Sequence, residues 1–403
     1  MKILVSGASV AGPSVALWLG RAGHEVTVVE IAPTLRKGGY AVDFRGEVFL
    51  TVLERMGVLG ELRKRQTGGS AMRFVDASEK QLMRLPPEFA GGELEVLRSD
   101  LSQVLYEHGR DVAAYRFGDS IASLHETAGG VDVTFESGLE ETYDLVIGAD
   151  GMHSVVRRLA WPAERVTERH LGYYVAGWEV PNTIGAVEDS LLYNVPGRMA
   201  SVSADRRDPA LAQTLFVFKS PVLAYDRRDR DQQKAIVREH FAGLGWRVPE
   251  LLEGLPSATE LYFDSISRVH VDRWSTGRIV LLGDAGYGAT FGALGTGTAV
   301  VGAYVLAGEL AAGNYPGAFE RYESRLRKAV STTQDGSQAG RFLAPPSRFG
   351  ITARNRMLSN RFLMGQMIKM AQKMSTLIEL PAYSMQQGST QQGSAEQGQL
   401  VQE

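Results

Sequence analysis

The feature that most constrains this fold is a tight turn at residues 7–12, Gly7-Ala8-Ser9-Val10-Ala11-Gly12. An apolar run over residues 2–6 predicts a strand before the turn, and apolar spacing over residues 13–22 predicts a helix after it. A second strand, residues 25–30, is rich in valine and ends in Glu30. The free N–H groups of such a helix N-terminus favour a pyrophosphate, and an acid at the tip of the next strand accepts from a ribose. We therefore predict a dinucleotide site containing Gly7, Ser9, Ala11, Gly12 and Glu30, with Ser9 in place of the usual middle glycine.

Composition excludes several classes of function. The 403 residues include no cysteine, and the seven histidines have no metal-binding spacing, so thiolate chemistry is excluded and no metal is expected. The net charge of −3 creates no field that would recruit nucleic acid or an anionic membrane, and neither partner is expected. Met1 leads directly into the first strand without a secretory signal. We expect a cytoplasmic protein, either a monomer or a homodimer.

The middle of the chain has a different pattern from its start. Helices are expected at residues 46–55 and 100–107, and strands at residues 131–135 and 143–148. Repeated β runs then occupy residues 165–270, with examples at 173–178, 191–195, 214–218 and 260–263. The α/β pattern returns at residues 278–284. We predict a sheet-rich second domain inserted into the first.

A second motif, Gly283-Asp284-Ala285, ends the strand at residues 278–284. Ligands of α/β sheets bind at the carboxyl ends of strands, where Asp284 can accept from a ribityl hydroxyl. Gly295, Thr296 and Gly297 then open a buried helix at about residues 298–310, whose N-terminus can stabilise negative charge on a ring edge. Residues 285–308 carry no charge, but the first half of this stretch has the composition of a loop. The helix that remains is too short to span a membrane. Because NAD has no ribityl chain, two separated sites favour FAD.

These motifs resemble the class A flavoprotein aromatic hydroxylases of the p-hydroxybenzoate hydroxylase type, and within them the branch of the tetracycline-inactivating monooxygenases. A third motif, Asp150-Gly151 with Ser154 and Arg157, supports the match. Residues 38–46 resemble the segment lining the flavin ring, and Arg98 resembles the family's flavin-contacting arginine. The similarity covers roughly residues 1–330. It implies an α/β fold, with a Rossmann-like FAD-binding domain, an inserted β-sheet substrate domain and a C-terminal helix.

The expected domain limits follow from this resemblance. The FAD-binding domain takes residues 1–70, 98–165 and 271–330, and the substrate domain takes residues 71–97 and 166–270. A C-terminal helical segment, residues 331–383, precedes a disordered tail, residues 384–403, whose Gln, Ser and Gly cannot bury enough surface to order themselves.

The resemblance also implies an FAD-dependent monooxygenase of secondary metabolism. In such enzymes NAD(P)H is a co-substrate without a Rossmann site of its own and reduces FAD. The reduced flavin traps O₂ as a C4a-hydroperoxide, which transfers oxygen to a small apolar substrate, here expected to be aromatic or polyketide-like. The cofactor-binding residues added by the resemblance are Arg36, Asp43, Arg45, Arg98, Leu101 and Asp150. Arg45 is also the catalytic candidate, with a surface ion pair to Asp43 or Glu47 as the alternative.

The chain departs from the family in one loop. Where the family usually has GDAAH, this chain has Gly286-Tyr287 in place of the last two residues, and Ala289, Thr290 and Phe291 replace the usual prolines. In the family this loop shapes the pocket beneath the flavin ring. A dehydrogenase or oxidase on the same fold, and a flavin-binding protein without turnover, therefore stay open as alternatives.

Two further groups of residues have two interpretations each. Aromatic residues are candidates to line a substrate cavity, although strand alternation turns about half of them elsewhere. They are Tyr173, Tyr174, Trp178, Phe216 and Phe218. A C-terminal helix with Leu363, Met367, Met370, Met374 and Leu377 is expected to pack across both domains, rather than to act as a lid or lie on a membrane. His170 is expected to be structural.

Overall fold

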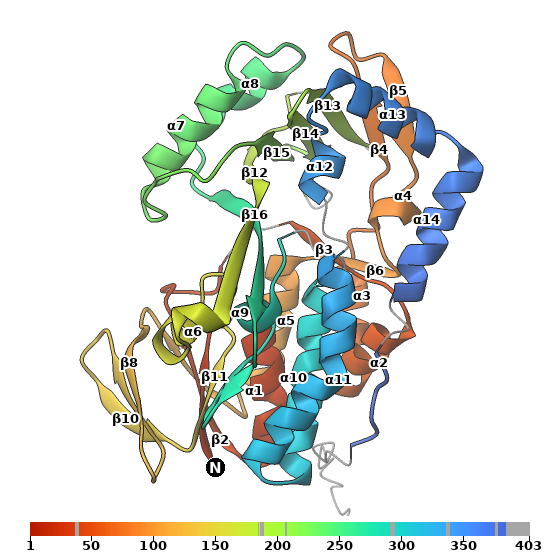
Figure 1. The fold of residues 1–403 in the computed structure, drawn as a ribbon. Helices are drawn as coiled ribbons and strands as arrows, with labels where there is room; N and C mark the ends of the chain where they lie inside the picture. The colour runs from red at the N-terminus through yellow and green to blue at the C-terminus, as the bar shows by residue number, and fades with distance from the viewer. Residues whose placement is uncertain are drawn as a thin grey trace, which may run out of the picture.

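The computed structural model describes residues 1–36, 40–183, 185, 189–205, 208–290, 295–335, 339–374 and 378–383. The lower part of the molecule in Figure 1 is built on a six-stranded sheet. Its strands, in spatial order, are β17 (Ser275–Thr276), β18 (Ile279–Leu281), β11 (Leu145–Gly148), β1 (Lys2–Ser6), β2 (Glu25–Glu30) and β7 (Ala114–Phe117). All neighbours are parallel except β17 and β18.

Helices cover this parallel sheet, which explains why its central strands are continuous apolar runs. Ile3, Leu4 and Val5 of β1 are fully buried, as a strand with both faces covered requires. The helices of this part are α1 (Ala11–Arg21), α2 (Glu47–Met56), α3 (Leu59–Lys64), α5 (Arg98–Gly109), α6 (Val155–Ala160), α9 (Asp284–Tyr287), α10 (Gly295–Ala312) and α11 (Tyr315–Asp335). The predicted buried helix near residues 298–310 is confirmed as the core of α10.

The predicted strand at residues 143–148 is confirmed as β11 from Leu145 to Gly148, but Tyr143 lies in another strand, because the chain changes sheets at Asp144. β10 (Glu140–Tyr143) belongs to a three-stranded antiparallel sheet with β8 (Ile121–Glu126) and β9 (Val131–Phe135). β11 belongs to the six-stranded sheet. The Asp144 carboxylate accepts from the Lys2 N–H at 2.7 Å and fixes the crossing point.

A seven-stranded sheet forms the upper part of the molecule (Figure 1). Its strands, in spatial order, are β16 (Leu261–Val271), β12 (Val166–Pro181), β15 (Leu211–Lys219), β14 (Arg198–Ala204), β13 (Ser190–Val195), β4 (Met72–Val75) and β5 (Gln81–Leu85). β4 pairs parallel to β13, so residues 72–85 join a sheet formed mainly by residues 166–271. The predicted α/β class with an added sheet is confirmed, while the domain limits stay predictions.

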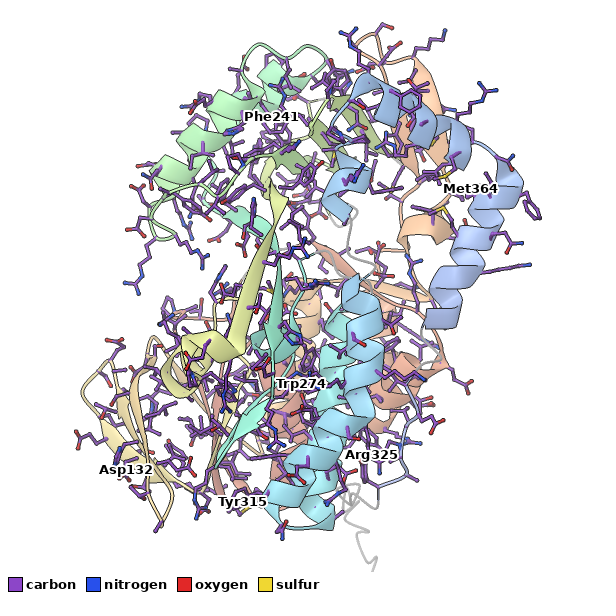
Figure 2. All side chains as sticks on the ribbon, in the orientation of Figure 1. Asp132, Phe241, Trp274, Tyr315, Arg325 and Met364 are labelled. Atoms are coloured by element: carbon purple, nitrogen blue, oxygen red, sulfur yellow. The ribbon has the colours of Figure 1, made fainter. Side chains whose placement is uncertain are left out.

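The aromatic residues of this sheet fill cores rather than open space. Tyr174, Trp178, Phe216 and Phe218 pack on one face under α7 (Arg230–Phe241) and α8 (Val248–Glu253). Phe241 of α7 is labelled in Figure 2 where it covers this face. Tyr173, one position out of phase, is buried on the opposite face. Four of the five therefore face the helices, as strand alternation led us to expect for about half of them, and a cavity-lining role for Tyr173 stays a prediction.

The C-terminal helices connect the two parts of the molecule. α12 (Ala339–Leu343), α13 (Arg348–Leu358) and α14 (Arg361–Met374) follow α11, and Met364 of α14 packs on the core below the seven-stranded sheet (Figure 2). Residues 378–383 return to α10, where the Tyr383 hydroxyl donates to Glu309 at 2.6 Å. Within the part of the chain that is described, every helix falls short of the length and apolar character needed to cross a membrane. Leu377 and the predicted tail, residues 384–403, lie outside the described residues.

Two short elements close the gap between the sheets. β3 (Ala41–Phe44) and β6 (Leu94–Leu97) pair as an antiparallel ribbon, and α4 (Pro87–Ala90) precedes β6. The ribbon places Tyr40 and Arg98 side by side, since the Arg98 N–H donates to the Tyr40 carbonyl at 3.2 Å.

Candidate active site

The β1–α1 turn has the close backbone packing that an anion site requires. Gly7 has a φ of 103°, and a Cβ at this position would lie 2.6 Å from the Ala149 carbonyl oxygen. A Cβ on Gly12 would lie 1.8 Å from the Gly7 carbonyl oxygen. The first N–H groups of α1, at Ala11 and Gly12, have no partner within the helix, and Pro13 has no N–H. The turn therefore presents unpaired donors and the positive end of a helix dipole.

Glu30 holds the other side of the turn. Its two carboxylate oxygens accept from the N–H groups of Ala8 at 2.8 Å and Ala32 at 3.0 Å. The residue is only 8% exposed, and the guanidinium of Arg36 lies 4.0 Å from it. Each oxygen keeps a free lone pair, so Glu30 can accept from ribose hydroxyls without losing either bond. Arg36 itself is largely exposed, with only this contact nearby in the described residues.

Three segments far apart in sequence meet at Gly283. This residue has a φ of 65°, and a Cβ on it would lie 3.3 Å from the Ala11 Cβ and 3.2 Å from the Ala299 Cβ. The end of β18, the start of α1 and the start of α10 therefore converge. Gly295, Thr296 and Gly297 stand at the N-terminus of α10, beside this point. Gly297 also allows α10 to approach α2, because a Cβ there would lie 2.7 Å from the Phe49 ring.

Arg98 joins the first motif to Asp284. Its Nε donates to the Ser9 hydroxyl at 3.2 Å. Burial raises the pKa of Asp284, the positive charge of Arg98 opposes that shift, and Asp264 adds to it. Asp284 nevertheless keeps part of its surface exposed, so it lies deep in the protein and still borders open space. Leu101, by contrast, is fully buried in the core of this part, and its side chain is directed away from such a space.

The seven-stranded sheet contributes a tyrosine and a carboxylate to the same region, and a second tyrosine, Tyr40, comes from the start of the β3–β6 ribbon. Tyr262 and Asp264 lie on one face of β16, and Tyr262 contacts Tyr40 edge to face at 5.5 Å. The Tyr40 hydroxyl donates to the Thr214 carbonyl at 3.3 Å and occupies the space left by Gly177, where a Cβ would lie 1.3 Å from it. Tyr40 is thereby fixed across both parts of the molecule.

The Tyr262 side chain lies among protein groups that shift its pKa, and part of its surface is still exposed to solvent. Burial raises its pKa, Asp264 adds to that rise and Arg98 opposes it, so its phenol stays protonated at neutral pH. Yet 37% of the residue is exposed, and its hydroxyl makes no hydrogen bond to any part of the chain that is described. It is the side chain of this region best placed to contact a bound molecule.

A histidine missed by the sequence analysis faces the same strand. His153 Nε2 lies 3.1 Å from each oxygen of Asp264, which is distant by 111 residues. Its Nδ1 is buried and has no hydrogen-bond partner in the described parts of the chain. The available signals were the position of His153 two residues after Gly151 and the two-residue spacing of Tyr262 and Asp264, which places both on one face of a strand.

Asp150 serves mainly to shape the turn that carries His153. Its carboxylate accepts from the Ser154 hydroxyl and from the N–H groups of Val155 and Val156 at 2.8 and 3.1 Å, and so caps α6. Arg157, which is buried, donates to the Ala285 carbonyl at 2.7 Å. The Asp150-Gly151 motif therefore holds α6 against the Asp284 segment, and a contact of Asp150 with the cofactor stays a prediction.

Arg45 is engaged in an ion pair. Its Nε donates to the Asp43 carboxylate, and its Nη2 donates to the Phe89 carbonyl at 3.1 Å. This arrangement matches the alternative interpretation of Arg45, except that the pair is largely buried rather than on the surface. The structure therefore ties Asp43 and Arg45 to the β3–β6 ribbon, and their cofactor contacts stay predictions. Gly38 and Gly39 of the same segment lie outside the described residues.

The altered loop after Asp284 is partly described. Tyr287 points into the core, where its hydroxyl lies 3.1 Å from that of Tyr322 and its ring lies 4.3 Å from the Trp274 ring. Thr290 then joins β16, accepting from the Ser267 N–H at 3.3 Å. The Tyr287 side chain is therefore held in the core by its contacts with Tyr322 and Trp274. Phe291 lies outside the described residues.

Comparison with known proteins agrees with this geometry. The profile of the family described as FAD binding domain matches residues 1–332. A flavin-dependent monooxygenase of Legionella longbeachae is 39% identical over 341 residues, covering 83% of this chain and 87% of the relative. The crystal structure of tetracycline destructase Tet(55) has a TM-score of 0.82 at 35% identity, covering 95% of this chain and 98% of that chain. Klebsiella pneumoniae HpxO complexed with FAD and uric acid shares the fold, with a TM-score of 0.74 at 22% identity, 94% of this chain and 98% of that chain.

Proposed function

Because this chain belongs to the FAD binding domain family and is an FAD-dependent monooxygenase, we propose that it consumes NAD(P)H and O₂ to oxygenate a small, largely apolar molecule. The likeness to tetracycline destructase structures favours an aromatic or polyketide-like substrate. The observation that carries the proposal is the meeting of Asp284, Arg98 and Tyr262. Asp284 belongs to the second motif, Arg98 contacts Ser9 of the first motif, and Tyr262 belongs to the sheet that would hold a substrate.

The residues present fit FAD. The unpaired N–H groups of α1 would hold the pyrophosphate, and Glu30 would accept from the adenosine ribose. Asp284 would accept from the ribityl chain, in the space bounded by Gly283 and the start of α10. When bound, FAD would supply the redox chemistry, taking electrons from NAD(P)H and activating O₂.

The chain's own residues supply charge stabilisation and substrate positioning. The guanidinium of Arg98 and the N-terminus of α10 place positive potential where a reduced flavin ring would be negative. Tyr262, protonated at neutral pH, offers one hydroxyl donor beside the fixed ring of Tyr40. A mainly apolar substrate with a carbonyl or phenol oxygen suits this combination.

The test measures oxygen transfer directly. The purified protein is supplied with NADH or NADPH, isotopically labelled O₂ and a panel of phenolic and polyketide compounds. The masses of the products are then measured by mass spectrometry. We expect ligand-stimulated NAD(P)H consumption and one labelled oxygen in a product. If the molar amount of hydrogen peroxide equals that of the NAD(P)H consumed, and no compound gives a labelled product, the protein is an oxidase. A yellow protein that consumes no NAD(P)H would indicate flavin binding without turnover.

A further inference from the structure

The most exposed apolar surface of the described chain lies on α13 and α14. Phe349 is 84% exposed and Phe362 is 71% exposed, and three other apolar side chains of the same helices are also exposed. Those three are Met357, Leu363 and Met367. We call these five residues the α13–α14 face. Large exposed apolar side chains gathered on two consecutive helices point to an interaction site, whereas single scattered ones are ordinary surface.

The two phenylalanines of the α13–α14 face, Phe349 and Phe362, are directed away from the protein core. On α14, Met364 packs on the core below the seven-stranded sheet, and Phe362 lies about 160° around the helix from it. On α13, Leu358 is fully buried, and Phe349 lies about 180° around the helix from it. The two helices follow one another along the same edge of the molecule (Figure 1). Among the described side chains of α14, Met364 therefore packs on the core while Phe362, on the opposite side, is exposed.

The charge of this segment differs from that of the rest of the chain. Residues 339–374 contain seven Lys and Arg and no Asp or Glu, whereas the whole chain has a net charge of −3. The remaining residues therefore carry a net −10, since −3 minus 7 is −10. Arg348, Arg356 and Lys369 are exposed beside the apolar residues. A surface that is basic and apolar together is complementary to an anionic surface with an apolar interior.

We propose that the α13–α14 face binds the surface of an anionic lipid bilayer, with Phe349 and Phe362 inserted among the acyl chains. Amphipathic helices with phenylalanine and leucine on one side and Lys or Arg beside them bind in this way. Each basic side chain near the bilayer adds attraction to anionic headgroups. The proposal is independent of the oxygenase activity. It departs from the sequence expectation of no membrane partner, because sequence alone did not show that these apolar side chains are exposed.

The test uses the full-length flavoprotein and sedimentation with vesicles. Vesicles of phosphatidylcholine mixed with phosphatidylglycerol are compared with vesicles of phosphatidylcholine alone. We expect binding to the mixed vesicles only, weakened by salt. The double variant Phe349→Ser with Phe362→Ser should bind more than about tenfold more weakly, because two apolar insertions are lost. Val222→Ser is the matched control, since Val222 is 74% exposed but lies outside the face.

A charge variant keeps the test decisive if the double variant folds poorly. Arg348→Gln with Lys369→Gln should weaken binding and reduce its salt dependence without altering an apolar residue. The proposal is overturned if the wild type ignores anionic vesicles at low ionic strength, or if neither variant differs from Val222→Ser. If the wild type is a dimer and the double variant is a monomer, the face binds a second copy of the chain instead. A raised KM with unchanged vesicle binding would assign it to a lid over the substrate.

Discussion

Replacement of Glu30 by glutamine separates its two roles in the β1–α1 turn. Its two oxygens each accept one backbone N–H, from Ala8 at 2.8 Å and from Ala32 at 3.0 Å. Glutamine keeps one oxygen and turns an NH₂ group toward the other N–H, so one donor loses its acceptor. A buried unsatisfied donor costs about 1–3 kcal/mol. We expect the apo-protein to lose about that amount of stability while keeping its fold, because the strand is formed by Val26, Val28 and Val29.

The same substitution should also weaken FAD binding. A hydrogen bond from a ribose hydroxyl to a carboxylate contributes about 1.5–3 kcal/mol. Its loss corresponds to roughly 10- to 150-fold weaker affinity. Urea unfolding of the apo-protein and fluorescence titration with FAD measure the two effects separately. Glu25→Gln, at the exposed start of the same strand, is the control and should change neither quantity. If Glu30→Gln matches this control in both measurements, the role given to Glu30 is refuted.

Four further outcomes are expected. The Asp284→Ala variant should purify with little FAD, as measured by flavin absorbance. The stability of its apo-protein at neutral pH should be unchanged or higher, because burial raises the pKa of the Asp284 carboxyl and disfavours its ionised form. Tyr262→Phe should raise the KM of the substrate about 2- to 10-fold with FAD affinity unchanged, and an equal KM would remove the hydroxyl from substrate binding. Arg45→Ala should slow flavin reduction by NAD(P)H in stopped flow with FAD still bound, and a wild-type rate would leave only its pairing role. Glu309→Gln should cost about 2 kcal/mol in thermal unfolding, less than a fully buried pair because its arginine partners are half-exposed. Burial acts to raise the pKa of Glu309, but hydrogen bonds from Tyr383 and the two arginines outweigh it and leave the pKa lowered. The loss of stability in Glu309→Gln should therefore be present at neutral pH and disappear as the pH falls through that lowered pKa.

The C-terminal segment shows why helical spacing did not predict its contacts. Spacing placed Leu363 and Met367 on one side of a helix, and that helix is confirmed as α14. Spacing does not say what covers that side. In the structure Met364 meets the core, whereas Leu363 and Met367 remain exposed. The structure gives no side-chain placement for Met370, Met374 and Leu377, so the favoured interpretation of packing across both domains stays a prediction for this side of the helix.

The sequence by itself determined the local elements and the cofactor class. β1 and β2 have the bounds that were predicted, because apolar runs and β-branched residues are short-range properties of the chain. The β1–α1 turn requires Gly7 and Gly12 for steric reasons that can be read without a structure. Together with the Asp284 motif, these features were sufficient to identify FAD.

Only the tertiary structure decided which distant residues meet. The pairing of His153 with Asp264, the contact of Arg98 with Ser9 and the fixing of Tyr40 over Gly177 each join segments 89 or more residues apart. The strand predicted at residues 143–148 is divided between two sheets at Asp144. An apolar or alternating pattern specifies that a side chain is buried, but not the partner that buries it, because that partner is chosen by the packing of the whole chain.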